Sequence, residues 1–248
     1  MNLLIDIGNS RIKWIMDTGK FSGSGGSFAY TVNTLAASLD HNFTLLESQP
    51  VNVYVSNVAG DEVKSKARQW VADRFGVAPE FAVSQREKCG LINAYIHADQ
   101  LGVDRFLAMI GAQSLTAQPI VVADFGTATT VDCINSNNEF IGGVILPGLA
   151  LMRESLAAEA SALSAAYANE KINFFAIDTV AAISSGTMLA TTGVVEGAVK
   201  KLSEITGEGA KCFTTGGDGN IVRPHLGIDA EYQPDLVLKG LSEYFRAE

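Results

Sequence analysis

The sequence predicts an α/β protein built from two related halves. The main observation is a repeat in which a short apolar strand ends in Asp-x-Gly and small polar residues follow. It occurs at 3–10 (LLIDIGNS) and again at 121–128 (VVADFGTA). The aspartates, Asp6 and Asp124, are 118 positions apart (124 minus 6), close to half of the 248 residues. This period indicates duplication of a whole domain, and we expect halves of 1–117 and 118–248.

The segment after each Asp-x-Gly also favours this fold. Residues 11–16 alternate apolar and polar side chains, and residues 129–134 are rich in β-branched side chains, so both read as strands. The repeat is therefore a β-hairpin. P-loop and dinucleotide-binding folds place a helix directly after their glycine loop, which argues against both.

The rest of the chain alternates strand and helix patterns. Residues 51–55 read as a buried strand, and residues 63–75 have the apolar spacing of a helix. The later elements are expected as a helix from about Asp104, a strand at 139–146, a helix from about 149, a helix at 179–204, a strand at 211–215 and a helix at 236–245. The helix at 179–204 carries Gly186, Ala190, Gly193 and Gly197 on one face. Small residues permit close packing or a dimer contact, with approach to a ligand as the alternative.

Composition limits the possible partners. With 47% hydrophobic residues the chain can bury a large core, and its net charge of -9 disfavours a nucleic-acid partner. A single nucleotide remains possible, because backbone N–H groups, one lysine and a metal can hold a triphosphate. No signal segment or long apolar stretch is present, so we expect no membrane association and a cytoplasmic location. Cys89, Cys133 and Cys212 are expected to be reduced core thiols.

The first repeat has the features of a phosphate-binding loop. Gly8 lets the backbone approach a ligand, Asn9 and Ser10 offer short donors, and Lys13 adds a positive charge. Asp6 would be repelled by phosphate, so we expect it to hold a hydrated divalent metal such as Mg²⁺. The alternative is an ordinary Asn-Ser hairpin turn.

The second repeat, DFGTATT, makes that alternative weaker. Gly126 is surrounded by the hydroxyl groups of Thr127, Thr129 and Thr130, and Asp124 ends its strand as Asp6 does. Two such loops could hold one triphosphate.

These motifs resemble those of the acetate and sugar kinase, heat-shock ATPase and actin superfamily. Its members have two ribonuclease-H-like domains with nucleotide in the cleft between them. Within it the chain is similar to type III pantothenate kinases over most of its length. The motifs that carry this similarity are, in order, DIGNSRIK at 6–13, GVDR at 102–105, DFGTATT at 124–130, GGVILPG at 142–148 and TGGD at 215–218.

The resemblance implies an activity and its cofactors. The chain would phosphorylate pantothenate to 4′-phosphopantothenate with ATP, the first step of coenzyme A biosynthesis. It would need Mg²⁺, and Asp124 would bind a monovalent cation, K⁺ or NH₄⁺. Asp104 would be the general base. Substrate would be held by Tyr95, Gly102, Val103, Arg105 and, from the neighbouring subunit of a homodimer, Thr179. The stretch 89–95 (CGLINAY) departs from the family pattern Gly-Val-Arg-Asn-Gly-Tyr before the substrate tyrosine.

The chemistry of Asp104 and Arg105 fits these roles. Asp104 stands at a helix start, where the helix dipole favours an anion and is expected to lower its pKa. It need only orient the alcohol and accept the proton late in a loose phosphoryl-transfer transition state. Arg105 can bind a carboxylate through two parallel hydrogen bonds. The alternatives are a helix-capping aspartate and a surface arginine. The alternatives for the function of the whole chain are another small-molecule kinase of this superfamily and a non-catalytic regulator.

Overall fold

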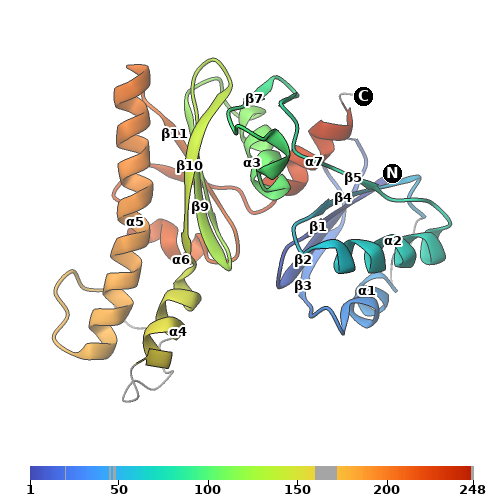
Figure 1. Ribbon diagram of the computed structural model, residues 1–248, viewed down its shortest axis with the longest axis horizontal. Coiled ribbons are helices and arrows are strands. Elements are labelled where there is room, and N and C mark those ends of the chain that lie inside the picture. Colours follow the sequence, from blue (N-terminus) through green and yellow to red (C-terminus); the bar gives the residue numbers. More distant parts are fainter. Residues whose placement is uncertain (20, 45, 47–48, 160–171, 247–248) are drawn as a thin grey trace. The chain divides into compact units, whose positions relative to one another are not determined.

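The computed structural model describes residues 1–19, 21–44, 46, 49–159 and 172–246. The chain forms two compact units, Met1–Leu115 with Asp235–Glu248, and Thr116–Pro234 (Figure 1). The sequence predicts halves of 1–117 and 118–248. In the structure the last helix of the chain is part of the first unit. No helix of the described residues is long and apolar enough to cross a membrane.

The first unit contains seven strands and five helices or 3₁₀ turns among its described residues. They are β1 (Asn2–Ile7), β2 (Arg11–Asp17), β3 (Gly25–Ala29), α1 (Leu35–Phe43), β4 (Asn52–Asn57), α2 (Asp61–Phe75), β5 (Glu80–Phe81), β6 (Glu87–Lys88), β7 (Leu91–Asn93), η1 (Ala98–Gln100) and α3 (Val103–Gln113), completed by the C-terminal helix α7 (Leu236–Arg246). Strands β1 to β5 form one sheet in the order β3-β2-β1-β4-β5. Strands β6 and β7 form a short antiparallel hairpin.

The second unit is built on a sheet whose strands follow the order β10-β9-β8-β11-β12. Its elements are β8 (Ile120–Phe125), β9 (Ala128–Ile134), β10 (Glu139–Pro147), α4 (Leu149–Glu159), α5 (Thr179–Thr206), β11 (Lys211–Thr215), α6 (Gly219–Val222), η2 (Arg223–His225) and β12 (Ala230–Tyr232). The long helix α5 packs on β8 and β9, and Figure 1 shows it running along the sheet that contains β9, β10 and β11.

The two sheets repeat the same pairing, strand by strand. In each, the first strand pairs antiparallel with the hairpin partner that follows it, and parallel with a later strand. In both, a further antiparallel strand follows the hairpin partner, and a further parallel strand lies next to the later strand. The predicted duplication is therefore confirmed in the topology, and Asp6 and Asp124 end equivalent strands.

The first sheet is covered on both faces. Leu3, Ile5 and Ile7 join the side chains of α1 and α2 in one core. Because successive side chains of a strand point to opposite faces, Leu4 and Asp6 point to the other face. Helices α3 and α7 pack on strands of this sheet, and the Tyr54 ring, level with Leu4, stacks at 4.0 Å on a ring of α7. Asp6 therefore lies on the face that α7 covers.

Helices α3 and α7 approach each other unusually closely. A Cβ added to Gly240 of α7 would lie 2.6 Å from the carbonyl carbon of Leu107, and one added to Gly111 of α3 would lie 3.1 Å from the Gly240 nitrogen. Ordinary contacts of a Cβ begin at about 3.4 Å. Only residues without a side chain allow this approach, which explains why the end of the chain belongs to the first unit.

Helix α5 contributes to the core of the second unit through the face opposite to its glycines. Met188, Val195 and Leu202, spaced seven residues apart, are buried against the sheet. A Cβ added to Gly186, Gly193 or Gly197 would meet no atom within 4 Å. Close packing of this small-residue face within the chain is therefore wrong for the described residues, because the large apolar residues of α5 make the core. The dimer contact and the approach to a ligand stay predictions.

Candidate active site

The first phosphate motif is a tight turn between β1 and β2. The Gly8 nitrogen donates to the Arg11 carbonyl at 3.0 Å, and this bond closes the turn around Asn9 and Ser10, both exposed. The motif is thus a hairpin turn in shape. Its exposed polar groups at the carboxyl end of β1 are those expected of a phosphate loop.

Tyr30 holds this turn from the side, and sequence reasoning missed it. Its hydroxyl donates to the Gly8 carbonyl at 2.7 Å and its nitrogen donates to the Ser10 carbonyl at 3.2 Å. Burial, and then the charge of Asp6, raise the pKa of Tyr30. The hydroxyl therefore stays protonated and remains a donor at neutral pH.

Asp6 lies in a row of polar side chains across three strands. Lys13 of β2 is its antiparallel partner and Ser56 of β4 its parallel partner. Directly paired residues have their side chains on the same face of a sheet. The Ser56 hydroxyl is buried and has no hydrogen-bond partner among the described residues. A carboxylate, an ammonium group and a hydroxyl thus lie on the same face of three adjacent strands.

The second phosphate motif repeats this arrangement with different side chains. The Gly126 nitrogen donates to the Ala128 carbonyl at 3.1 Å. Asp124 is paired with Thr130 of β9 and with Thr215 of β11. Thr129 is paired with Phe125 instead, so its buried hydroxyl, which lacks a hydrogen-bond partner within the described residues, points to the other face of the sheet. Hydroxyl groups around one carboxylate are ligands suited to a hard cation, and this motif, unlike the first, places no lysine opposite its aspartate.

The TGGD loop packs directly on this second motif. The Asp218 nitrogen donates to the Phe125 carbonyl at 3.0 Å, and the Tyr232 hydroxyl donates to the Gly216 carbonyl at 3.2 Å. Gly216 has a φ of +88°, and a Cβ there would lie 2.6 Å from the Phe125 carbonyl carbon and closer still to Asp124 Oδ1. Glycine is therefore required on both conformational and steric grounds.

Asp218 carries a perturbed carboxyl group in this loop. Burial raises its pKa, and the positive charge of Arg153 on α4 acts in the opposite direction. Arg153 was not among the predicted site residues. A basic residue in the helix that follows the GGVILPG motif was the available signal.

Asp104 lies in the first turn of α3, where the sequence predicts it. Gly102 occupies the N-cap position, so Asp104 is not the capping residue. Its Oδ1 accepts a hydrogen bond from the Arg105 nitrogen at 2.8 Å, and a Cβ on Gly102 would lie 2.7 Å from the same oxygen. Gly102 thus leaves room for the carboxylate.

The expected pKa of Asp104 is wrong in direction. Burial raises its pKa, and the backbone hydrogen bonds and the charge of Arg105 only partly oppose this. The loss of water around the carboxylate outweighs the favourable groups at the helix start. A carboxyl group with a raised pKa is a better proton acceptor than an ordinary aspartate.

Arg105 and Tyr95 are in contact. Arg105 is only 7% exposed, so the surface-arginine alternative is wrong. Its Nη1 donates to the Tyr95 hydroxyl at 2.9 Å, and its guanidinium carbon lies 5.8 Å from the centre of the tyrosine ring. The altered stretch before Tyr95 therefore still brings this side chain to the GVDR segment.

A cavity of about 490 Å³ lies next to the same segment, within the first unit. Gly102 and Val103 form one wall, and the ends of β4 and β5 with the start of α2 form the others. Lys64 and Ser84 also line it. Ligands of α/β proteins commonly bind at the carboxyl ends of parallel strands, and this cavity occupies that place.

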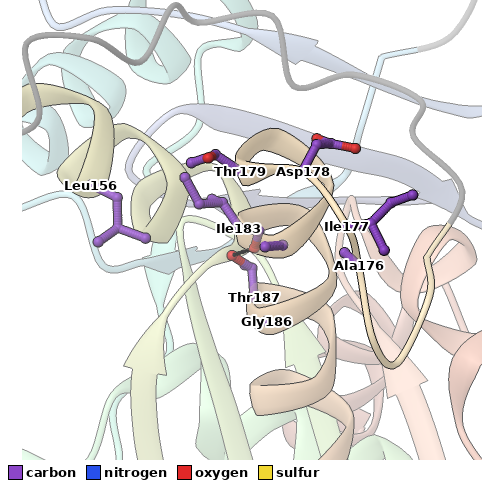
Figure 2. Close-up of a pocket in the computed structure, with 9 residues that line it drawn as sticks. Leu156, Ala176, Ile177, Asp178, Thr179, Ile183, Gly186 and Thr187 are labelled. Atoms are coloured by element: carbon purple, nitrogen blue, oxygen red, sulfur yellow. Dashed lines mark hydrogen bonds between the residues drawn. The ribbon is translucent and has the colours of Figure 1, made fainter.

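Thr179 is the first residue of α5, and it is exposed in the second unit. The preceding Asp178 caps the helix by accepting a hydrogen bond from the Ala181 nitrogen at 2.9 Å. Thr179 lines a cavity of about 610 Å³ together with Leu156 of α4 and Ile183 of α5, as Figure 2 shows. The adjoining Phe175 is 86% exposed.

The predicted site residues fall into two sets. The first unit holds Asp6, Gly8, Asn9, Ser10, Lys13, Tyr95, Gly102, Val103, Asp104 and Arg105. The second unit holds Asp124, Gly126, Thr127, Thr129 and Thr179. Within the second unit, Thr179 starts a helix, whereas the other four belong to one hairpin.

Two of the three cysteines are poor nucleophiles. Burial raises the pKa of Cys133 to about 11 and that of Cys212 to about 12, so neither is a nucleophile at neutral pH. Cys89 is exposed, which corrects the expectation that all three are core residues; it occupies the tight turn between β6 and β7. Among the described residues, no group of three or more His, Cys, Asp or Glu could hold a metal. A metal at Asp6 would take its other ligands from water and phosphate.

Comparison with known proteins agrees with these observations. The family model of type III pantothenate kinases matches residues 2–201. The type III pantothenate kinase of Janthinobacterium sp. strain Marseille is 38% identical, and the match covers 97% of this chain and 96% of the relative. That of Herminiimonas arsenicoxydans is also 38% identical, over 97% and 96%. MreB 5 of Spiroplasma citri, solved with bound AMPPNP, has a TM-score of 0.53 at 9% identity and covers 96% of this chain and 94% of its own. This likeness shows the fold of the actin-like ATPases and sugar kinases.

Proposed function

The chain belongs to the type III pantothenate kinase family, which phosphorylates pantothenate with ATP on the way to coenzyme A, and from this premise we propose roles for its residues. The observation that carries the proposal is the arrangement of side chains at the first turn of α3. Asp104, with its raised pKa, and the buried Arg105 are adjacent in the first turn of α3, and Tyr95 contacts Arg105.

Arg105 and Tyr95 are assigned to the carboxylate end of pantothenate. A guanidinium group has five N–H donors in a rigid fork that matches a carboxylate. Holding the fork against Tyr95 fixes its orientation before substrate arrives, which reduces the entropy lost on binding. The backbone of Gly102 and Val103 forms the adjoining wall, beside the cavity of the first unit.

Asp104 is assigned as the general base. In the transfer, the primary hydroxyl oxygen of pantothenate forms a bond to the γ-phosphorus of ATP, and the bond from that phosphorus to the β–γ bridging oxygen breaks. The hydroxyl proton passes to the Asp104 carboxylate, and ADP leaves with the electron pair of the broken bond. Burial supports this role, since the raised pKa brings the acceptor closer to working pH.

The two phosphate loops are assigned to ATP. Lys13 supplies a positive charge for the phosphate oxygens, and the loops at 8–10 and 126–129 supply backbone N–H and hydroxyl donors. Asp6 would hold a divalent cation through water, and that cation supplies positive charge that phosphoryl transfer requires. The row formed by Lys13, Asp6 and Ser56 supports this assignment.

Asp124 is assigned to a monovalent cation, K⁺ or NH₄⁺. The support is chemical: threonines, Thr130 and Thr215, occupy both of the strand positions that are paired with Asp124. Oxygen donors are ligands of hard cations, and one carboxylate balances the charge of one monovalent cation.

The chain is assigned a homodimeric state in which Thr179 joins the acceptor pocket of the other subunit. The support is the exposed apolar segment just before Thr179, where Phe174, Phe175 and Ile177 all face solvent. Exposed apolar groups of this size mark interaction surfaces. The free cysteines and the use of ATP fit a cytoplasmic location.

These assignments are tested by ADP release from the purified protein with ATP, Mg²⁺ and pantothenate, in potassium and in sodium buffers. We expect pantothenate-dependent turnover that is greater in potassium. Equal turnover in both buffers would count against the Asp124 assignment. Turnover by Asp104→Asn at the wild-type rate, with pantothenate still bound, would remove Asp104 as the base.

A further inference from the structure

We propose that Asn93 is a positioning residue that sets the affinity for the acceptor substrate. It has no role in the proposed function, and it acts through the segment that carries Tyr95 and leads to Gly102. The inference rests on the proposed assignment of Tyr95 and Arg105 to pantothenate.

Asn93 is completely buried, with 0% of its surface exposed. Its side-chain amide makes three hydrogen bonds, all to backbone atoms. Nδ2 donates to the Gln85 carbonyl at 3.2 Å and to the Ala98 carbonyl at 3.0 Å, and Oδ1 accepts from the Tyr95 nitrogen at 3.0 Å. Both amide protons and the amide oxygen are therefore used to tie three points of one loop together.

Two of these three bonds hold backbone segments that lead to the proposed acceptor pocket. The bond to Tyr95 fixes the backbone whose side chain reaches Arg105. The bond to Ala98 fixes the start of η1, which ends two residues before Gly102. One buried amide thus links the two stretches of chain that supply the proposed carboxylate-binding groups.

Arg86 reinforces the same loop from its exposed side. Its Nη1 donates to the Asn93 carbonyl at 2.6 Å and its Nη2 donates to the Ile96 carbonyl at 2.9 Å. The Asn93 nitrogen in turn donates to the Arg86 carbonyl at 2.9 Å. The segment from 85 to 98 is therefore held by two side chains, those of Arg86 and Asn93, at the open end of the β6–β7 hairpin.

Only an amide satisfies these contacts at position 93. Aspartate would keep an acceptor for the Tyr95 nitrogen but would place a carboxylate against the two carbonyl oxygens of Gln85 and Ala98. Alanine would leave all three backbone groups without their partner. Unsatisfied buried groups are costly, so the loop would move to find new partners and would carry Tyr95 away from Arg105.

The test is steady-state kinetics of Asn93→Ala and Asn93→Asp in the full chain. We expect KM for pantothenate to rise by about tenfold or more, the size of effect produced by losing one well-placed buried hydrogen bond. We expect KM for ATP to change by less than about twofold, because no ATP-binding group is assigned to this loop. Arg86→Met, which removes two of the loop's bonds without opening a core cavity, should raise KM for pantothenate in the same direction.

Asn135→Ser is the matched control. Asn135 also makes three side-chain hydrogen bonds, but within the β9–β10 turn of the second unit. Both KM values should stay at the wild-type level. Circular dichroism and thermal unfolding of each variant show whether it folds, and if Asn93→Ala does not fold, Arg86→Met carries the test.

A double-mutant cycle with Tyr95→Phe separates positioning from a general loss of structure. Tyr95→Phe removes the hydroxyl that Arg105 contacts, so the effect of Asn93→Asp on pantothenate KM should shrink in that background. Full additivity, or an equal rise in both KM values, would overturn the inference. If Tyr95→Phe and Arg105→Lys themselves leave pantothenate KM unchanged, the underlying assignment of the pocket is wrong instead.

Discussion

Replacing Gly240 by alanine tests whether the contact of α3 with α7 supports both stability and catalysis. The new Cβ would lie 2.6 Å from the carbonyl carbon of Leu107, and closer to its oxygen. Ordinary contact begins at 3.4 Å, so the helices must separate locally by at least 0.8 Å (3.4 minus 2.6). The obstacle is backbone and cannot rotate away.

The change in the free energy of unfolding of Gly240→Ala follows from two opposing effects. Overpacking of this kind costs about 1–3 kcal/mol, whereas alanine in a helix interior regains about 0.5–1 kcal/mol over glycine. A net loss of about 1 kcal/mol lowers Tm by about 2–4 °C for a chain of this size. Because α3 carries Asp104 and Arg105, a displacement of about 1 Å is also expected to lower kcat/KM for pantothenate by up to about 10²-fold.

Thermal unfolding and steady-state kinetics measure the two effects, with Gly193→Ala as control. Gly193 is an exposed helix glycine whose added Cβ would meet nothing within 4 Å, so this change should leave Tm unchanged or raise it. A Gly240→Ala protein with wild-type Tm and wild-type kcat/KM would refute the reasoning. Loss of Tm with full activity would refute only its catalytic part.

Three further predictions concern the site directly. Asp104→Asn should lower kcat by about 10²–10⁴-fold and yet raise Tm at neutral pH. The pKa of Asp104 is raised in the folded state. Its contribution to stability is therefore complete below the unfolded pKa and is lost as pH rises through the folded pKa, so the charged carboxylate destabilises the fold at neutral pH and a neutral amide does not. Tyr30→Phe removes the bond to the Gly8 carbonyl and should raise KM for ATP by about two- to tenfold, with KM for pantothenate unchanged. Gly216→Ala should weaken activation by potassium in a salt titration, because its side chain would collide with the Asp124 carboxylate; an unchanged potassium midpoint would contradict this.

The sequence predicts the fold well where the pattern is local and repeated. The Asp-x-Gly hairpins, the helix that begins beside Asp104 and the long helix with its small-residue face are all present at the expected positions. The helix at 35–43 could also have been found, because Leu35, Leu39 and Phe43 have helical spacing and are buried. Strands of two or three residues, such as β5 and β12, carry too little pattern to be recognised.

What the sequence does not reveal depends on contacts between distant segments. The contact of Tyr30 with the first turn spans 22 positions, and no local pattern specifies it. The raised pKa of Asp104 depends on how much water its neighbours exclude, whereas its place at a helix start suggests the opposite shift. The close fit of Gly111 and Gly240 joins residues 129 positions apart (240 minus 111).

The return of α7 to the first unit also has a consequence for how the chain folds during synthesis. Helix α3 is made early, but its partner emerges from the ribosome only after all of Thr116–Pro234 has been translated. Domains are made at about 5–20 residues per second, so α3 and the sheet face beside it wait several seconds without their cover. The nascent first unit therefore exposes apolar surface for that interval, and it is completed only after the second unit has had time to fold.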